Sequence, residues 1–407
     1  MSEKKTPAIR FQGFTDDWEQ RKLGEVADVY DGVHQTPIYQ DSGIMFLSVE
    51  NISTLTSNKF ISEEAFERDY KNYPEKGDIL MTRIGDVGTP NVVETAEKVA
   101  FYVSLALLKP KDTDSFFLCN TIRSTGFQKG LRNRTLVTAI PQKINKDEIG
   151  KVEFQMPTNP DEPKKIGIYF KILDHLITLH QRKLTKLQLL KKSMLTKMFP
   201  KDGARVPEIR FQGFHGDWKE QRLSKLAEVK DSARIPNSLW ASEGVPYIRA
   251  SDLTNDDLSG TLFLSSDTFS FYKNRTGAPE KGDVLFNGGG EIGKALLKPD
   301  DSDIYVQGGA VLYVKTSHAE NLSGEYLTMY FQSPFAKDYI NIAQAGGTMK
   351  HFTLQPAQDM PIVYPSDEEQ HKIGVYFQRL DNLYAIHQRK LSKLQQIKQA
   401  MLSKLFV

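Results

Sequence analysis

The chain has 407 residues and a formal net charge of +2; 39% of its residues are hydrophobic and 26% are charged. This length exceeds one ordinary domain. The composition is that of a soluble globular protein, with neither a membrane-length apolar run nor the hydrophobic stretch of a secretory signal. Its one cysteine, Cys119, excludes an internal disulfide and a cysteine-based metal cluster, so we expect a reduced, cytoplasmic setting.

A motif near the start of the chain returns two hundred residues later. Residues 7–18 are PAIRFQGFTDDW and residues 207–218 are PEIRFQGFHGDW, which indicates an internal duplication. The residues that follow, around 20–29 and 221–229, predict a short helix or turn that leads into a strand.

The next stretch of each copy diverges, apart from short matched islands. One island is PEKGDIL at 74–80 and PEKGDVL at 279–285. Its proline and Gly-Asp pair predict a tight turn, and the apolar residues behind them predict a buried strand. We therefore expect a mixed α/β domain with a twisted, largely antiparallel sheet in each copy. Other strands are predicted at 44–49, 99–108, 152–157, 247–248, 310–314 and 362–365, and helices around 115–123 and 324–339.

Two long stretches, residues 166–198 and 373–405, carry the same apolar period at an offset of 207 residues. Apolar side chains recur in alternating steps of four and three, the seam of a coiled coil. At about 1.5 Å per residue each helix is roughly 50 Å long, and its seam needs a partner, for which the other copy is the obvious choice. Polar interruptions recur as well, with Lys191 answered by Lys398. The seam positions are Ile166, Phe170, Leu173, Ile177, His180, Leu184 and Leu187, and Ile373, Phe377, Leu380, Tyr384, His387, Leu391 and Leu394.

Acidic residues open both helices, at 161–162 and 367–369, where negative charge suits the N-terminal helix dipole. Beyond these openings the helices are basic. Segments 161–200 and 367–407 carry net charges of +6 and +3, so the rest of the chain is net acidic. Such basic faces are either solvated surfaces beside the seam or surfaces for a phosphate backbone or an acidic partner subunit.

The end of the chain corresponds to the position just before the second copy of the motif. The first helix is followed by the helix-breaking run 199–203 and by Pro207, whereas the second helix ends with the chain itself. This circular pattern predicts a pseudo-two-fold arrangement. We expect an α+β fold in which two mixed α/β domains are separated by two long antiparallel coiled-coil helices. The predicted divisions are 1–160, 161–206 for the central helix, 207–366, and 367–407 for the C-terminal helix.

Short sequence blocks also recur at equivalent places in the two helices. The blocks are EQHKIG at 369–374, Leu380-Asp381 and HQRKL at 387–391, and KIG at 165–167, Leu173-Asp174 and HQRKL at 180–184. With these blocks, the duplicated organisation and the Lys-Gly-Asp turn, the chain resembles the specificity (S) subunits of type I restriction-modification systems over nearly its whole length.

The resemblance implies that each mixed domain is a target-recognition domain that reads one half of a split, asymmetric DNA site. It implies that the paired helices space the two domains and dock two methyltransferase (M) subunits, which modify adenine with S-adenosylmethionine. Restriction (R) subunits then cleave unmethylated DNA with ATP and Mg²⁺, so no cofactor and no catalytic residue is expected on this chain. Half-sites about one DNA turn apart, roughly 34–36 Å, suit a spacer of this length.

A glycine-rich run after the predicted strand at 283–286 is the most tempting catalytic motif. Residues 288–295, GGGEIGKA, fit a dinucleotide-binding pattern and, but for Ala295, a P-loop. Both patterns need a long helix next, but Pro299 interrupts, and the matching loop 83–89, RIGDVGT, keeps two glycines only. We therefore expect a hairpin-like loop whose glycines allow close approach of the backbone, here to DNA.

Polar and basic side chains in and near these loops are the candidate DNA contacts. Arginine reads guanine and asparagine reads adenine through paired hydrogen bonds, and Lys or Arg in short polar loops contacts phosphates. An ordinary solvated surface loop is the alternative for each. The candidates are Thr82, Arg83, Arg123, Arg132, Arg134, Arg249, Lys273, Arg275, Asn287, Lys294, Lys350 and His351, the last two from the stretch 346–351.

The sequence contains no recognisable metal-binding or catalytic constellation. The eight histidines lack ligand spacing, and His180 and His387 lie on the seam, where a polar residue that fixes helix register is the simpler interpretation. The leading hypothesis is a DNA-reading subunit whose partners are double-stranded DNA, two M subunits and R subunits, with no membrane. The alternatives are a coiled-coil adaptor that does not read DNA and a nucleotide-dependent enzyme built on the glycine-rich loop.

Overall fold

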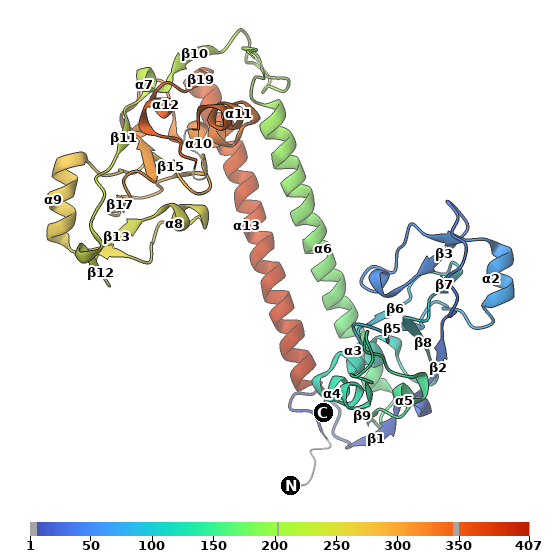
Figure 1. Cartoon of the computed structure of the whole chain (residues 1–407). Helices are drawn as coiled ribbons and strands as arrows, with labels where there is room; N and C mark the ends of the chain where they lie inside the picture. The colour runs from blue at the N-terminus through green and yellow to red at the C-terminus, as the bar shows by residue number, and fades with distance from the viewer. Residues whose placement is uncertain (1–5, 202, 345–349, 407) are drawn as a thin grey trace. The chain divides into compact units, whose positions relative to one another are not determined.

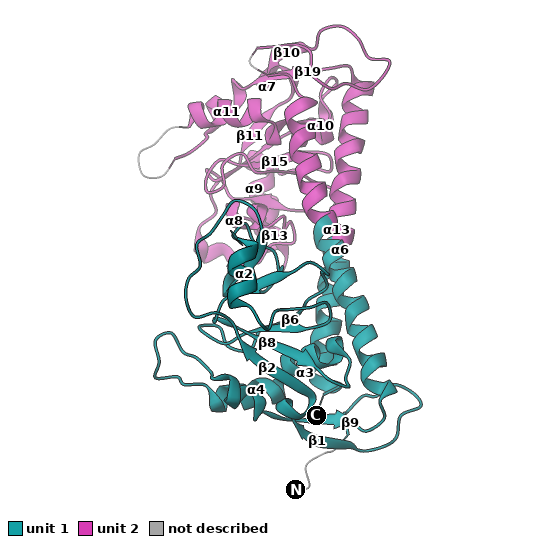
Figure 2. Cartoon of the chain, turned by 90° about the vertical axis from the view of Figure 1, so that its right-hand side faces the viewer, with its two compact units in different colours: residues 1–182, 388–407 teal, residues 183–387 magenta. Residues whose placement is uncertain are grey.

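A computed structural model describes residues 6–201, 203–344 and 350–406 of the chain. The chain forms two compact units (Figures 1 and 2): unit 1 comprises residues 1–182 with 388–407, and unit 2 comprises residues 183–387. Both long helices, α6 (Asp161–Lys197) and α13 (Asp367–Lys404), contribute a segment to each unit. With 37 and 38 residues, they confirm the prediction of two helices longer than thirty residues.

The main sheet of unit 1 consists of β2 (Ala27–Asp31), β8 (Leu105–Pro110), β5 (Ile79–Thr82) and β6 (Pro90–Val92), in that order and all antiparallel. Successive residues of a strand face opposite sides of a sheet. Ile79 and Met81 therefore pack into one cluster with Phe117, and Leu80 packs with Phe101 in another. Because both faces of the sheet are covered, its central strand is a continuous apolar run, as the sequence predicted.

A smaller sheet in unit 1 has the order β4-β3-β7, with β4 (Phe60–Ile61), β3 (Ile44–Leu47) and β7 (Val99–Phe101). Strand β3 pairs with β7 in parallel. A separate antiparallel pair joins β1 (Trp18–Lys22) to β9 (Glu153–Pro157). The helices of unit 1 besides α6 and α13 are α1 (Leu23–Val26), η1 (Val49–Asn51), α2 (Glu63–Asp69), α3 (Ser115–Arg123), α4 (Thr125–Arg134) and α5 (Lys146–Gly150).

Unit 2 repeats this plan. Its main sheet has the order β11 (Val229–Asp231), β18 (Val311–Val314), β15 (Val284–Asn287) and β16 (Ala295–Leu297), and its smaller sheet the order β12 (Trp240–Ala241), β14 (Phe263–Leu264), β13 (Val245–Ile248) and β17 (Tyr305–Val306). Strand β10 (Lys219–Arg222) pairs with β19 (Pro361–Tyr364). The remaining helices are α7 (Leu223–Leu226), η2 (Asn237–Leu239), α8 (Ala250–Thr254), α9 (Ser266–Thr276), η3 (Thr316–His318), α10 (Gly324–Gln332), α11 (Pro334–Ala343) and α12 (Leu354–Gln358).

The predicted mixed α/β character and the largely antiparallel sheets are confirmed, with local differences. Each unit contains one parallel strand pair, β3 with β7 and β13 with β17. The helix expected around 324–339 is two helices, because Ser333 caps α11 through its hydroxyl and Pro334 follows. The strand expected at 99–108 is likewise two strands, separated by a turn in which Leu105 N donates to Tyr102 O at 2.9 Å.

The two long helices run antiparallel within each unit. In unit 2, Lys191 Nζ donates to the Asp381 carboxylate at 2.7 and 2.9 Å, and Gln188 Nε2 donates to Tyr384 Oη at 2.9 Å. From Gln188 to Lys191 the residue number rises by three, while from Tyr384 to Asp381 it falls by three, so the helices run in opposite directions. In unit 1, Lys398 pairs with Asp174. This is the counterpart of the Lys191–Asp381 pair at an offset of 207, so the two lysines that interrupt the seam form matched ion pairs.

The N-terminal motif closes the end of α13 in unit 1. Ile9 N donates to Lys404 O at 3.1 Å, as Ile209 N donates to Lys197 O at 2.8 Å in unit 2. Phe406 then packs against Phe117 and Phe170 at ring-centroid distances of 5.8 Å. The end of one helix and the start of the chain therefore meet, as the circular sequence pattern predicted.

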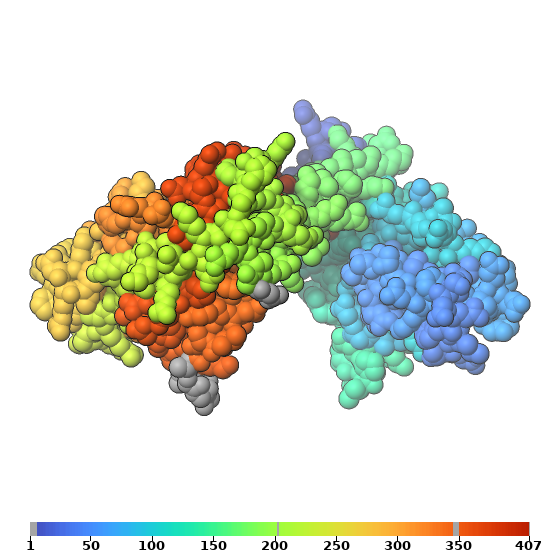
Figure 3. Space-filling model, turned by 90° about the horizontal axis from the view of Figure 1, so that it is seen from above, coloured from blue at the N-terminus to red at the C-terminus, as the bar shows by residue number. Residues whose placement is uncertain are grey.

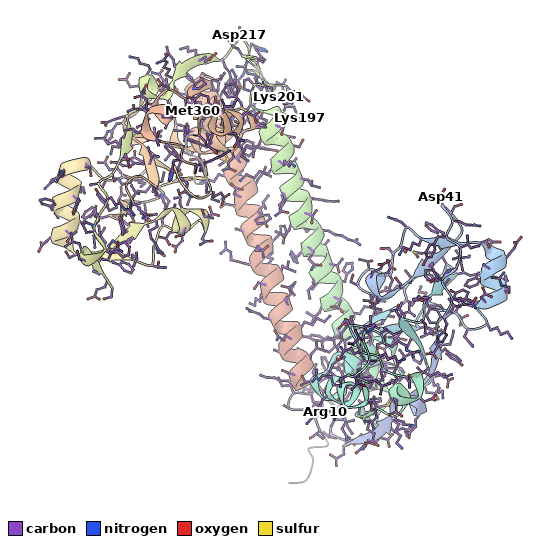
Figure 4. All side chains as sticks on the ribbon, viewed as in Figure 1. Arg10, Asp41, Lys197, Lys201, Asp217 and Met360 are labelled. Atoms are coloured by element: carbon purple, nitrogen blue, oxygen red, sulfur yellow. The ribbon has the colours of Figure 1, made fainter. Side chains whose placement is uncertain are left out.

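An ion pair with a buried carboxylate ties the same motif to the start of α6; its arginine, Arg10, is labelled in Figure 4. Arg10 donates from Nε and Nη2 to the Glu162 carboxylate, both at 2.7 Å, and Trp18 Nε1 donates to it at 3.2 Å. Arg210 and Glu369 repeat the pair in unit 2 at 2.7 and 2.8 Å. At the opposite end of α6, Lys197 and Lys201, both labelled in Figure 4, share Glu208 at 2.7 and 3.6 Å.

Although Phe406 stands next to the last residue of the sequence, we expect Phe406→Ala to destabilise unit 1. The substitution removes a buried ring from the core around Phe117 and Phe170, so the free energy of unfolding should fall by about 3–5 kcal/mol. Urea unfolding measures the loss, and amide hydrogen exchange locates it. The matched control is Phe199→Ala, which should weaken unit 2 instead, since Phe199 packs with Phe377 and Trp218. A loss below about 1 kcal/mol for Phe406→Ala would contradict this packing role.

Candidate nucleic-acid interface

The loop at 83–89 connects β5 to β6 as a tight hairpin. Thr82 N donates to Thr89 O at 3.0 Å, and Gly88 N donates to Thr82 O at 2.9 Å. Gly85 and Gly88 have φ of 81° and 100°, a left-handed conformation that favours glycine. The hairpin-like loop predicted from the sequence is therefore confirmed.

The glycine-rich run of unit 2 forms the same kind of hairpin. Asn287 N donates to Lys294 O at 2.9 Å and Gly293 N donates to Asn287 O at 2.8 Å. Strand β16 follows at once, where a P-loop or a dinucleotide-binding motif requires a helix. The geometry therefore disfavours a nucleotide-binding enzyme.

In unit 1, a second loop lies against the hairpin at 83–89. It follows α4 and is itself a small hairpin, closed by Leu136 N donating to Lys143 O at 2.8 Å. Gly85 N donates to Gln142 O and Gln142 Nε2 donates to Gly85 O, both at 2.9 Å. Ile144 N donates to Arg83 O at 3.0 Å. The hairpin at 83–89, singled out from the sequence, is thus bonded to Gln142 and Ile144, which follow the candidates Arg132 and Arg134 along the chain.

Unit 2 shows the corresponding contact in the residues that are described. Phe352 N donates to Gly288 O at 2.8 Å, and the ring of His351 lies beside Gly289. Lys350 and His351 are exposed there. The other candidate positions of this stretch, Gly346, Gly347, Thr348 and Met349, lie outside the described residues.

The end of α4, the loop that follows it and the start of α5 form a basic stretch. Residues 129–146, called the basic segment below, contain five cationic residues and no aspartate or glutamate. All five are exposed or half-exposed, and no carboxylate in the described part of the chain lies within ion-pair distance of any of them. They are Lys129, Arg132, Arg134, Lys143 and Lys146. A group of exposed cations without ion pairs is suited to a phosphate backbone.

Three candidate residues at the base of the hairpins are buried. Thr82 and Asn287 are 0% exposed and Arg83 is 6% exposed. The Arg83 guanidinium forms an ion pair with Asp31 and donates from Nε to Ile144 O at 3.1 Å, and burial lowers its pKa below the usual value. In this conformation the side chain supports the basic segment and is not presented to solvent.

Asn287 and Thr82 are similarly occupied. Asn287 Nδ2 donates to Ala250 O at 3.0 Å and to Thr254 Oγ1 at 3.1 Å, which ties β15 to α8. Thr82 Oγ1 accepts from Thr89 N at 2.9 Å. Whether these residues or Arg83 also contact DNA stays a prediction; the contacts seen here position the loops.

The other candidates lie in separate places. Arg123 donates to Asp174 at 3.3 Å and to Pro90 O at 2.9 Å, which ties α3 to α6. Lys294 pairs with Asp256 at 2.7 Å. Arg249 pairs with Asp252 and Lys273 with Asp303, and Arg275 is exposed on α9. Of these other candidates, Arg132 and Arg134 lie on α4 just before the loop that contacts the hairpin of unit 1, and Lys294, Lys350 and His351 lie in or beside the hairpin of unit 2.

Sequence reasoning missed part of this surface. Lys129, Lys143 and Lys146 were not among the candidates, and neither were the exposed apolar residues Leu136 and Ile140. The available signal was the complete lack of carboxylates over residues 129–146. By contrast, α2 of the same unit carries four exposed acidic residues, Glu63, Glu64, Glu67 and Asp69, of which Glu67 pairs with Lys98 and Asp69 with Arg68. The start of this helix, with Glu63 and Glu64, is therefore less suited to phosphate than the basic segment.

Other site classes find no support in the described residues. No group of three or more His, Cys, Asp or Glu side chains among them is arranged to hold a metal ion. Cys119 is buried, and burial raises the pKa of its thiol. Over the same residues, no helix has the length and apolar character needed to cross a membrane.

Known proteins resemble the chain along most of its length. The family described as "Type I restriction modification DNA specificity domain" matches residues 15–189 and 215–396. The "Putative type I restriction enzyme MjaX specificity subunit" of Methanocaldococcus jannaschii is 22% identical over 421 residues, which cover 95% of this chain and 92% of that protein. The crystal structure of the type I restriction-modification S subunit from M. genitalium has a similar fold, with a TM-score of 0.67 and 14% identity over 99% of each chain.

We expect Arg83→Ala to loosen the basic segment. The substitution removes a donor to Ile144 O and the partner of Asp31, so the free energy of unfolding should fall by about 1.5–3 kcal/mol and amide exchange over residues 136–144 should accelerate. The control Arg132→Ala, at an exposed residue without an ion pair in the described chain, should change stability by no more than about 0.5 kcal/mol. Unchanged stability and exchange with lost DNA binding would instead make Arg83 a direct reader.

Proposed function

The chain belongs to the family of type I restriction-modification DNA specificity domains, and we propose that it reads a split DNA site, one half with each unit. The family assigns DNA recognition to such chains. The division into two readers is supported by the internal duplication, because each unit has its own sheets, its own hairpin and its own share of both helices.

The observation that carries this proposal is a constant scaffold that holds unlike loops. The ion pairs Arg10–Glu162 and Arg210–Glu369 are equivalent, as are the contacts between each motif and a helix end. The hairpins differ, with RIGDVGT in unit 1 and GGGEIGK in unit 2. Unlike loops on like scaffolds favour two different half-sites, and hence an asymmetric target.

In unit 1 we assign the phosphate contacts to the basic segment. Phosphate contacts position a protein on DNA without giving sequence information. Sequence must then be read by side chains or backbone of the adjoining hairpins, whose glycines permit close approach. In unit 2 the corresponding contacts fall to Lys350, His351 and Lys294, and Lys294 would exchange Asp256 for a phosphate.

The long helices are proposed to dock two M subunits, one on each unit. Both units expose large apolar residues on these helices, away from the seam, and exposed apolar patches mark protein-binding surfaces. In unit 1 they are Ile168, Ile172 and Leu179, and in unit 2 Leu189, Leu190, Leu383 and Ile386. The internal duplication supports the number two.

The chemistry of the assembly is assigned to its other subunits. S-adenosylmethionine would be bound by the M subunits for adenine methylation, and ATP and Mg²⁺ by the R subunits for cleavage. This chain is proposed to work in the cytoplasm on double-stranded DNA and to contribute recognition and assembly. A coiled-coil adaptor that no longer reads DNA is the second candidate, which the exposed apolar helix faces alone would also suit.

Adenine methylation in cells distinguishes these two functions. We expect that co-expression of the chain with an M subunit methylates adenine at one split motif only, because each unit fixes one half of the site. Single-molecule sequencing of the host genome detects the modified positions. The M subunit expressed without this chain is the control, and methylation at unrelated sequences in the presence of the chain would favour the adaptor.

The helices are expected to set the gap between the half-sites. One heptad is deleted from α6 between Asp174 and Lys191, and one from α13 between Asp381 and Lys398. Both ion pairs and the apolar period then survive, while about 10 Å of helical rise is lost. The methylated motif should keep its bases and have a shorter gap. An unchanged gap would show that the helices are not the spacer.

A further inference from the structure

The hairpin in the middle of the basic segment has an apolar tip that no part of the described chain covers. Leu136, Val137 and Ile140 are 46%, 70% and 100% exposed. Figure 2 shows the loop beyond α4 extending away from the rest of unit 1, and Figure 3 shows a narrow protrusion in the colour of residues near 140. Three large apolar side chains gathered on one exposed hairpin mark a binding surface.

This tip is braced at its base. The hairpin is closed by hydrogen bonds between Leu136 and Lys143, and Ala139 N donates to Leu136 O at 3.3 Å. The segment that returns from the tip is fixed to the hairpin at 83–89 by the paired hydrogen bonds between Gln142 and Gly85. The apolar side chains are therefore presented on a supported hairpin, and little conformational freedom remains to be lost on binding.

The surroundings of the tip identify its partner by charge. All five charged side chains of the segment are cationic and form no ion pair in the described chain, and the carboxylates of Asp147 and Glu148 follow at the start of α5. An apolar tip flanked by cations is complementary to a polyanion with an apolar interior. A DNA duplex is such a polyanion, because its phosphates lie outside and its stacked bases inside. The acidic residues at the start of α2, Glu63 and Glu64, make that part of unit 1 less suited to the same contact.

We propose that the apolar tip enters the DNA between two neighbouring base pairs and partly unstacks them, with Ile140 as the leading side chain. Arg132, Arg134 and Lys143 would neutralise the flanking phosphates. The inference rests on the proposed function of unit 1 as a reader and specifies how it reads. Apolar wedges of this kind kink a duplex, and the cost depends on the step that is opened.

The consequence is a form of specificity without hydrogen bonds to bases. Pyrimidine–purine steps unstack most easily, so the half-site of unit 1 should contain or adjoin such a step. Direct contacts from the hairpin at 83–89 and the unstacking at the tip would then act on neighbouring base pairs, because the two loops are bonded to each other through Gly85 and Gln142.

The test uses the full chain with its M subunits and a duplex that carries the split motif mapped by methylation. Adenines in and around the half-site of unit 1 are replaced one at a time by 2-aminopurine, whose fluorescence rises when it unstacks. We expect a rise at one step only. Ile140→Ala should abolish this rise and weaken binding roughly tenfold, because most of a fully buried isoleucine is lost from the interface.

A matched control and a rescue accompany this variant. Ile38 is 87% exposed in another loop of unit 1, and Ile38→Ala should leave both fluorescence and binding unchanged. Placing an abasic site at the opened step removes most of the unstacking cost, which only the wild type pays, so the wild type should gain affinity and Ile140→Ala should not. Arg132→Ala should lower the salt dependence of binding while the fluorescence rise persists.

The outcomes separate the wedge from the reading function. Specific binding of the split motif without a fluorescence rise at any position would overturn the wedge and leave the two-reader function intact. The wedge also falls if Ile140→Ala weakens binding while the rise persists. Equal binding of the split motif and a scrambled duplex would instead reject the reading function itself.

Discussion

A buried carboxylate at the start of each long helix is the contact on which the rest of each unit depends. The Glu162 side chain is 0% exposed and is held by Arg10 through two bonds of 2.7 Å. A buried charge left without its partner costs about 3–5 kcal/mol, so the N-terminal motif must lie where its guanidinium meets the carboxylate. That same placement brings Ile9 N to the end of α13. One ion pair thereby fixes the start of one helix and the end of the other.

In both units the loops carried by this scaffold share an attachment that is made through the backbone. Ile144 N donates to Arg83 O in unit 1, and Phe352 N donates to Gly288 O in unit 2. A backbone bond places no demand on the side chains at its ends, apart from excluding proline as the donor. The loop sequences can therefore diverge while their arrangement is kept, which is what the pairing of RIGDVGT with GGGEIGK shows. Constancy of the scaffold and variation of the loops have the same structural origin.

The contrast between a constant scaffold and variable loops also explains which features could be predicted from the sequence. The helices, their seam and the turn before β5 were predictable, because each depends on a local period or on residues within one turn. The parallel pair β3–β7 and the burial of Arg83 were not. Arg83 is buried because Asp31 and Ile144, each more than fifty residues away, meet at its guanidinium. The basic segment was only partly predictable, because its loop meets the hairpin through contacts between residues more than fifty positions apart.

The matched ion pairs of the helices determine the register of the coiled coil, which the apolar seam alone leaves ambiguous. An apolar seam alone distinguishes poorly between registers one heptad apart, because each heptad offers similar side chains to its partner. A slip of one heptad would separate Lys191 from Asp381 in unit 2 and Lys398 from Asp174 in unit 1. Such a slip would also break the hydrogen bonds from Ile9 N to Lys404 O and from Ile209 N to Lys197 O, because the helix ends would move by seven residues. The polar interruptions therefore contribute a unique register, and with it a fixed placement of each helix end in the core of its unit.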